Sequence, residues 1–126
     1  MILREIIRGI KIKKFDGDDG LEISGISIDS NKVKEGYLFA ALKGEKTDGH
    51  RYIESALGNG AKALLVEDAP ERSYPGISVV RAGDSRESLA KASANFYGNP
   101  SKELCLAGVT GTNGKTTVTY LLESIW

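Results

Sequence analysis

The sequence has few of the features that identify secreted, membrane or nucleic-acid-binding proteins. It has one cysteine in 126 residues, so no disulfide framework can form within the chain. Basic and acidic side chains number 17 each, so no excess charge points to nucleic acid or an anionic membrane. No apolar run reaches membrane-spanning length, and residues 1–14 lack the cleavage site of a secretion signal. We therefore expect a cytoplasmic protein that binds neither nucleic acid nor a membrane.

A glycine-rich stretch at residues 108–117 predicts a phosphate-binding loop. The apolar run before it, residues 104–107, predicts a buried strand in which Cys105 is a small core residue. Apolar residues at helical spacing follow it: Val118, Leu121, Leu122 and Ile125. In a strand-to-helix turn, glycines let backbone N–H groups converge on phosphate oxygens, and the helix N-terminus adds its dipole.

Two side chains of this loop have predicted chemical roles. Lys115 is placed to neutralise β- and γ-phosphate charge, and the Thr116 hydroxyl to complete a Mg²⁺ shell. The loop reads T-G-T-N-G-K-T-T and departs from G-x-x-x-x-G-K-[ST], because Val109 stands where the first glycine is usual. The alternative is a plain glycine-rich turn with an exposed lysine.

Earlier in the chain, apolar runs alternate between strand and helix patterns. We predict strands at residues 21–28, 37–42, 61–66 and 77–80, and helices at 3–10, after His50 and after Asp84. Residues 11–20 are expected to be a solvated loop, and Gly98 with Pro100 should end the last of these helices. The fold class is therefore α/β, with a mixed sheet of about four to five strands flanked by helices.

We expect residues 1–98 to form one domain, and residues 99–126 to contain a linker and the start of a second. The second part holds one predicted strand, the loop and part of a helix, whereas a phosphate-binding ATPase domain needs several more parallel strands. We therefore expect the N-terminal part of a longer protein. Because its apolar faces would otherwise be exposed, residues 104–126 should pack on the first domain or on another copy of the chain.

Polar residues at two strand ends have alternative interpretations. Asp29, Ser30 and Asn31 follow the first predicted strand, where such residues often only form a turn. His50 could be a ligand or a base, but a lone histidine near a helix start is more often a cap or a hydrogen-bonded core residue.

Several blocks in a fixed order make the chain resemble the N-terminal region of the Mur ligases, the amide-forming enzymes of peptidoglycan synthesis. The blocks are Asp29-Ser30, residues 36–42 with Gly44, Asp48-Gly49-His50, residues 60–63, residues 96–101 and the loop at 108–117. The resemblance covers nearly the whole chain. One departure is Asn31, where the family usually has arginine, which removes a cation.

The resemblance implies a division of labour among three domains. The N-terminal domain holds the UDP end of the substrate, the central domain binds ATP, and the C-terminal domain brings the amino acid. By position, the UDP contacts would be Ile28, Ser30, Glu45, Lys46 and Thr47, with Glu45 contributing only backbone groups. The ATP loop would comprise Gly111, Thr112, Asn113, Gly114, Lys115, Thr116 and Thr117, with Lys115 catalytic and Thr116 on Mg²⁺.

The resemblance also implies a reaction. The complete enzyme would use ATP to add a third amino acid, L-lysine or meso-diaminopimelate, to UDP-N-acetylmuramoyl-L-alanyl-D-glutamate through an acyl phosphate. The residues present would be inactive alone and depend on the remaining central and C-terminal domains. Alternatives are the next ligase of the pathway, which adds D-alanyl-D-alanine, the folate or cyanophycin ligases, and a non-catalytic nucleotide-binding module.

Overall fold

A mixed five-stranded sheet forms the centre of the protein. The computed structural model describes residues 1–105 and 107–125. Its strands lie in the order β1-β5-β4-β3-β2, with bounds β1 (Ile12–Asp16), β2 (Gly25–Ser27), β3 (Tyr37–Ala40), β4 (Ala61–Val66) and β5 (Ser78–Ala82). Strands β2 to β5 are parallel, and β1 is antiparallel to β5. The predicted mixed sheet is confirmed.

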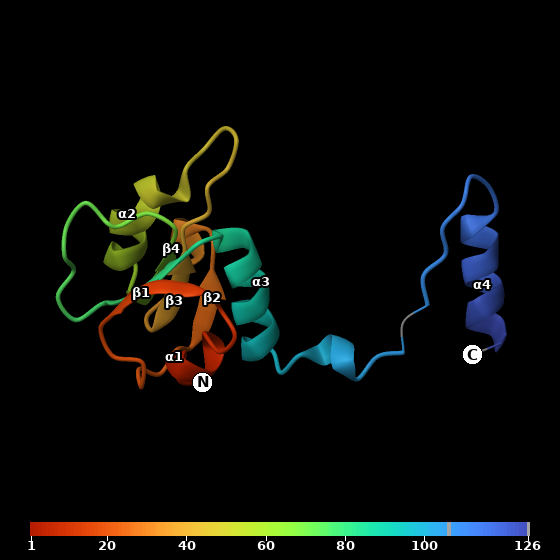
Figure 1. Ribbon diagram of the computed structural model, residues 1–126, viewed down its shortest axis with the longest axis horizontal. Helices are drawn as coiled ribbons and strands as arrows, with labels where there is room; N and C mark the ends of the chain where they lie inside the picture. Colours follow the sequence, from red (N-terminus) through yellow and green to blue (C-terminus); the bar gives the residue numbers. More distant parts are fainter. Residues whose placement is uncertain (106, 126) are drawn as a thin grey trace.

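Helices cover both faces of this sheet. The α-helices are α1 (Leu3–Ile6), α2 (Ile53–Gly58), α3 (Ser85–Phe96) and α4 (Lys115–Ile125), and the 3-10 turns are η1 (Ser30–Lys32), η2 (Gly49–Tyr52) and η3 (Pro100–Lys102). Helices α1 and α3 pack on one face and α2 on the other (Figure 1). Within the described ranges no helix is long and apolar enough to span a bilayer.

Alternation along the central strands divides the core into two layers. In β3, Leu38 faces α1 and α3, whereas Phe39 faces α2. In β4, Leu65 faces the first layer and Leu64 the second, and all four side chains are fully buried. Strands buried on both faces read as continuous apolar runs, which is why these two were predictable.

Three predicted boundaries at the N-terminal side are wrong. Residues 11–20 are not all loop, because β1 pairs with β5 there and Phe15 packs on the core. Lysines on an edge strand made it look like a loop. Helix α1 ends at Ile6 rather than near residue 10, before Gly9 at a φ of +78°. Strand β2 covers only three of the eight residues predicted.

The predicted strand at residues 104–107 is also wrong where it is described. Leu104, Cys105 and Ala107 belong to no strand, and Leu106 lies outside the described residues. Cys105 is exposed, not a core residue. A strand needs the hydrogen bonds of a neighbour, and none of the five described strands pairs with this segment.

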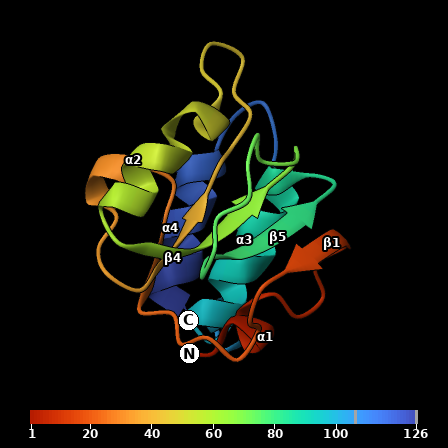
Figure 2. The same cartoon turned by 90° about the vertical axis from the view of Figure 1, so that its left-hand side faces the viewer.

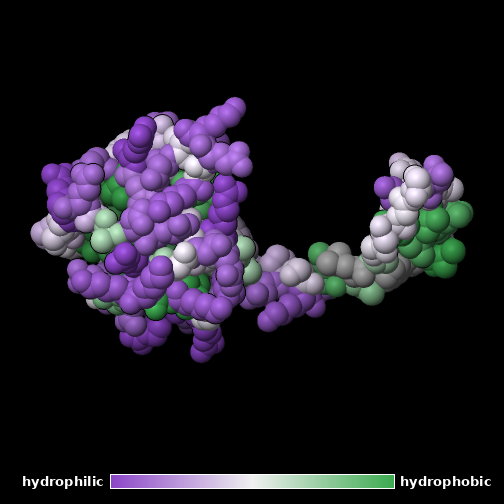
Figure 3. Space-filling view, turned by 45° about the horizontal axis from the view of Figure 1, so that its top comes forward, coloured by the Kyte–Doolittle hydropathy of each residue, from purple (hydrophilic) through white to green (hydrophobic). Residues whose placement is uncertain are grey.

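The predicted packing of residues 104–126 on the first domain is not found in the part described. In Figure 2 α4 is seen behind the sheet, but Figure 1 shows that the chain after α3 leads away from it. Several large side chains of α4 are exposed, and Figure 3 shows a green patch on this helix: Val118, Tyr120, Leu121 and Ile125 are the exposed residues, of which the three aliphatic ones are hydrophobic on the scale of the figure.

Gly60, between α2 and β4, lies close to the backbone of Glu35 in the segment before β3, and a substitution tests this close approach. Gly60 has a φ of +106°, and an added Cβ would lie 2.7 Å from the Glu35 Cα. Gly60→Ala should therefore lower the free energy of unfolding by about 2 kcal/mol, measured by urea denaturation. Gly58→Ala is the control, because nothing lies within 4 Å of its added Cβ. Equal losses in the two variants would contradict the strain at Gly60.

Candidate functional site

The carboxyl ends of β2, β3, β4 and β5 meet at one edge of the sheet, here called the carboxyl edge. Because these strands are parallel, the segments that follow them emerge on the same side. Ligands of open α/β sheets bind outside the carboxyl ends of the strands. The five predicted UDP contacts all follow β2 or β3, so the pairing of these two strands brings both groups to this edge.

The segment after β2 presents one apolar and one polar group. Asp29 accepts a hydrogen bond from Asn31 N at 2.9 Å and so begins η1. The Ile28 side chain is 56% exposed and so presents an apolar surface to solvent at this edge. Ser30 is 6% exposed, and its carbonyl accepts from Asn59 Nδ2 at 2.9 Å. The Ser30 hydroxyl forms no hydrogen bond with a described group. Every buried polar side-chain atom in the described part of the chain has a partner, so this hydroxyl is not buried and reaches the surface.

The segment after β3 forms a short hairpin whose tip is the turn Gly44–Thr47. Gly49 N donates to Leu42 O at 2.8 Å, and Gly44 N donates to Thr47 O at 2.9 Å. Both glycines are required, since an added Cβ would lie within 3 Å of the facing backbone. Glu45, Lys46 and Thr47 are all exposed on this projecting turn (Figure 1).

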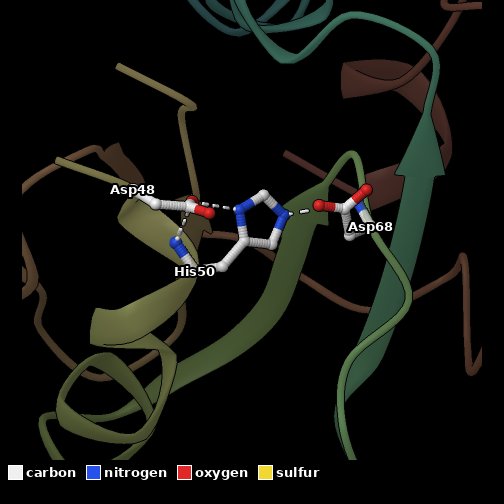
Figure 4. Close-up of side chains that lie close together, drawn as sticks. All are labelled: Asp48, His50 and Asp68. Atoms are coloured by element: carbon white, nitrogen blue, oxygen red, sulfur yellow. Dashed lines mark hydrogen bonds and ion pairs between the residues drawn. The ribbon is translucent and has the colours of Figure 1, made fainter. Parts of the chain in front are cut away.

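The base of the hairpin is fixed to the end of β4 through His50. Asp48 Oδ1 accepts from His50 N at 3.0 Å and lies 2.6 Å from His50 Nδ1 (Figure 4). On the other side of the ring, Nε2 accepts from Glu67 N at 3.2 Å and from Asp68 N at 3.3 Å. These partners define a neutral imidazole with its proton on Nδ1. The His50 N–H, and then its ring, hold the pKa of the Asp48 carboxyl below its ordinary value.

An ion pair joins the other side of the hairpin to the same strand end. Lys43 Nζ lies 2.6 Å from Asp68 Oδ2. The pair raises the pKa of Lys43 and lowers that of Asp68. Both side chains are substantially exposed, so water screens much of their attraction.

Asp48, His50 and Asp68 also have the composition of a metal site, since one potential ligand atom of each lies within 4.8 Å of the others. Both ring nitrogens of His50, however, already have hydrogen-bond partners. A cation at Nε2 would also meet two N–H groups that point their positive ends toward it. The geometry is therefore that of a hydrogen-bonded clamp between loop and strand.

Glu67 extends the contacts at this edge to α3. Its Oε1 accepts from Ser85 Oγ at 2.7 Å and from Ser85 N at 2.9 Å. The hydroxyl, and then the N–H, lower the pKa of the Glu67 carboxyl. Ser85 is fully buried at the start of α3, where Asp84 accepts from Glu87 N as the predicted cap.

A cavity of about 410 Å³ lies beside the clamp. His50, Glu54, Asp68 and Tyr74 are among the residues that line it. Two of its lining groups are paired with each other, because Tyr74 Oη donates to Glu54 Oε1 at 2.8 Å, and Arg72 from outside the lining lies 2.6 Å from Glu54 Oε2. The cavity is thus a polar pocket at the same edge, on the β4 side of the hairpin.

The predicted phosphate loop has the backbone of an anion site. Gly114 has a φ of +77°, and α4 begins immediately after it. The first bond of the helix runs from Val118 N to Gly114 O at 2.9 Å, so the N–H groups of residues 115–117 have no partner inside the helix. Residues 110–117 are exposed, and the structure does not bring them to the carboxyl edge.

Comparisons with known proteins agree with these features. The family model "Mur ligase family, catalytic domain" matches residues 22–97, more than half of the chain. The chain belongs to the Mur ligase family. A relative from Bacteroides thetaiotaomicron, UDP-N-acetylmuramoyl-L-alanyl-D-glutamate--2,6-diaminopimelate ligase, is 46% identical over 97% of this chain. This chain spans 25% of that relative, about a quarter of its length.

Solved structures of Mur ligases have the same fold. An Acinetobacter baumannii structure of UDP-N-acetylmuramoylalanyl-D-glutamyl-2,6-diaminopimelate--D-alanyl-D-alanyl ligase matches with a TM-score of 0.66 at 29% identity, over 98% of this chain and 26% of that one. MurF ligase from Thermotoga maritima in complex with ADP has a TM-score of 0.52 at 33% identity, over 77% of this chain and 21% of that one.

Sequence reasoning missed three residues at the carboxyl edge: Lys43, Glu67 and Asp68. Their side-chain partners are distant in the sequence, since Glu67 bonds Ser85, 18 residues away, and Lys43 pairs with Asp68, so no local pattern marks them. The caps at Asp29 and Asp48 did have a signal. In each, an aspartate carboxylate accepts from the N–H two residues later, where a 3-10 turn begins.

The lowered pKa of Glu67 predicts an acid-sensitive contribution to stability. Its folded pKa lies below the ordinary 4.5, so the contribution is present above pH 4.5 and is lost as pH falls through the folded value. Glu67→Gln keeps an acceptor for Ser85 but loses the charge, and should cost about 1 kcal/mol at pH 7. Chemical denaturation at pH values from about 3 to about 7, a range that spans the ordinary carboxylate pKa, should show the stabilities of the two proteins converging in acid. A constant difference across this range would contradict the charge effect.

Proposed function

We propose that this chain is the N-terminal part of an ATP-dependent ligase that extends UDP-N-acetylmuramoyl-L-alanyl-D-glutamate by a diamino acid. The observation that carries the proposal is the 46% identity to the 2,6-diaminopimelate ligase of Bacteroides thetaiotaomicron. The exposed side chains of residues 45–47 at the carboxyl edge also support it. The D-alanyl-D-alanyl ligase matches at 29% identity, which favours the first reading over the next step of the pathway.

In this proposal residues 1–98 form the domain that binds the sugar nucleotide. Ile28 offers an apolar surface for the uracil ring, and the Ser30 hydroxyl offers a hydrogen bond to a base or phosphate oxygen. Lys46 brings an ammonium group to the pyrophosphate from the tip of the turn. Glu45 would contribute backbone groups, since its carboxylate repels phosphate, and Thr47 adds a hydroxyl.

Residues 99–126 would contribute the linker and the start of the ATP domain. The unpaired N–H groups of residues 115–117 fit phosphate oxygens, and residues 111–114 supply the turn. Lys115 would neutralise the γ-phosphate. Thr116 offers one hydroxyl to Mg²⁺, which suits an ion that takes few protein ligands and keeps water and phosphate oxygens. The ADP complex of the related Thermotoga ligase supports the binding of an adenine nucleotide by the complete protein.

The chemistry divides between these two parts. A carboxylate does not acylate an amine directly, because oxide would have to leave. ATP would transfer its γ-phosphoryl group to the D-glutamate carboxylate, and the amine would then attack the acyl carbon, releasing phosphate and a proton. The charge that moves off the γ-phosphate is the charge that Lys115 is placed to stabilise.

A calorimetric titration with UDP-N-acetylmuramoyl-L-alanyl-D-glutamate tests the first half. The chain should bind it, and Lys46→Ala should weaken binding about tenfold by removing one charged phosphate contact. Arg8→Ala is the matched control, because it removes an exposed cation outside the carboxyl edge. No heat from a folded chain would favour a non-catalytic module instead.

The phosphate loop gives a second prediction. Because residues 110–117 are exposed and no described part of the sheet domain covers them, the 126-residue chain should bind ATP weakly, with a Kd on the order of 1 mM, and form no amide. Fluorescent-nucleotide competition and phosphate release measure the two quantities. Micromolar ATP affinity or ligase turnover would contradict this account.

A further inference from the structure

We propose that His50 positions the Gly44–Thr47 turn for the sugar nucleotide, and that it does so as a neutral hydrogen-bonding bridge. The inference rests on the proposed function, because the turn carries Glu45, Lys46 and Thr47. It assigns a role to the only histidine of the chain, which touches none of the five predicted UDP contacts through a described hydrogen bond.

The bridge adds side-chain contacts beyond the backbone pairing of β3 with β4, which ends near the base of the hairpin with Ala41 N donating to Leu65 O at 2.9 Å. On one side, the ring donates to Asp48, the residue directly after the turn. On the other side, it accepts two N–H groups at the end of β4, one from Glu67 and one from Asp68, and Figure 4 shows the second. Strand β4 is the most buried part of the sheet, with its last four side chains fully covered. His50 therefore ties a projecting turn to a rigid element.

Asp48 passes this constraint to the turn. It forms an isolated antiparallel bridge with Lys43, which closes the hairpin on either side of the turn. Its carboxylate also accepts from the His50 N–H, which begins η2. A shift of the His50 ring would therefore move Asp48 and change the orientation of Lys46 relative to the sheet.

The other anchor of the hairpin is weaker. The Lys43–Asp68 ion pair leaves 43% and 57% of its side chains exposed, whereas the His50 side chain is 14% exposed. Exposed pairs contribute little because water competes for them. Arg86 reaches Lys43 O only at 3.4 Å, a long contact. Among the described side-chain contacts, the constraint on the turn therefore depends mainly on His50.

Replacement of His50 separates its two contacts. Glutamine can place an oxygen near the Nε2 position and accept from Glu67 and Asp68, while asparagine can donate to Asp48 but is too short to reach β4. His50→Ala and His50→Asn should weaken the sugar nucleotide about tenfold, since the turn must then be ordered on binding, and His50→Gln should recover most of the affinity. Asp19→Asn is the stability control, because it breaks the Arg4–Asp19 pair, which involves no carboxyl-edge residue.

Nuclear magnetic resonance of the ligand-free chain provides a readout that does not depend on ligand binding. The single imidazole should show a protonated Nδ1 and an unprotonated, hydrogen-bonded Nε2 at neutral pH. In His50→Ala, the amides of residues 45–47 should change shift and exchange faster, while those of β4 before Glu67 should remain protected.

The outcomes distinguish the inference from the proposed function. If the wild-type chain binds the sugar nucleotide and His50→Ala binds it equally well, the positioning role is overturned. It is also overturned if Asp19→Asn loses the same affinity, or if His50→Gln restores none. If the wild-type chain does not bind, the proposed function fails. The resonances of residues 45–47 then decide whether His50 orders the turn, and unchanged resonances would overturn that role as well.

Discussion

The parallel pairing of β3 with β4 is the interaction on which the rest of the structure depends. Phe39 and Leu64 fill the layer beneath α2, and Leu38 and Leu65 fill the layer beneath α1 and α3. Because both faces are covered, neither strand can shift by one residue without exchanging its two core layers. Parallel pairing also fixes which loops meet, so the segments after Ala40 and Val66 lie together for the same reason that the core exists.

The parts of the fold predicted from sequence are those determined by local pattern. Strand β4 was predicted with its observed bounds, since five apolar residues and Lys62 between turn signals determine it. The N-cap at Asp84 and the end of α3 before Gly98 followed from side-chain chemistry. Strand β1 was missed because its order comes from pairing with β5 at the sheet edge. The strand predicted at residues 104–107 is wrong at the three described residues for the converse reason, since an apolar run forms a strand only beside a partner.

For the candidate site, the sequence predicted which segments would meet, but not the contacts between their side chains. The resemblance placed Ser30 and Lys46 after two strands, and strand pairing brings them to one edge. The sheet order β5-β4-β3-β2 has no reversal among its parallel strands, so topology alone marks no crevice for a ligand. Which side chains fix the hairpin depends on pairs such as His50 with Glu67, whose distance along the chain hides them from local pattern.

The carboxyl edge, proposed for UDP, and the loop at residues 111–117, proposed for ATP, differ in the contacts that stabilise their conformations. The carboxyl edge is supported by a core within residues 1–98 and by contacts such as those of His50 and Glu67. The phosphate loop is supported by α4, an 11-residue helix whose apolar side, including Leu121 and Ile125, is exposed. Isolated helices of this length are marginal in water, so packing against an apolar surface has to stabilise it. The N–H groups that would hold phosphate therefore depend on a surface that covers α4, whereas the groups that would hold UDP do not.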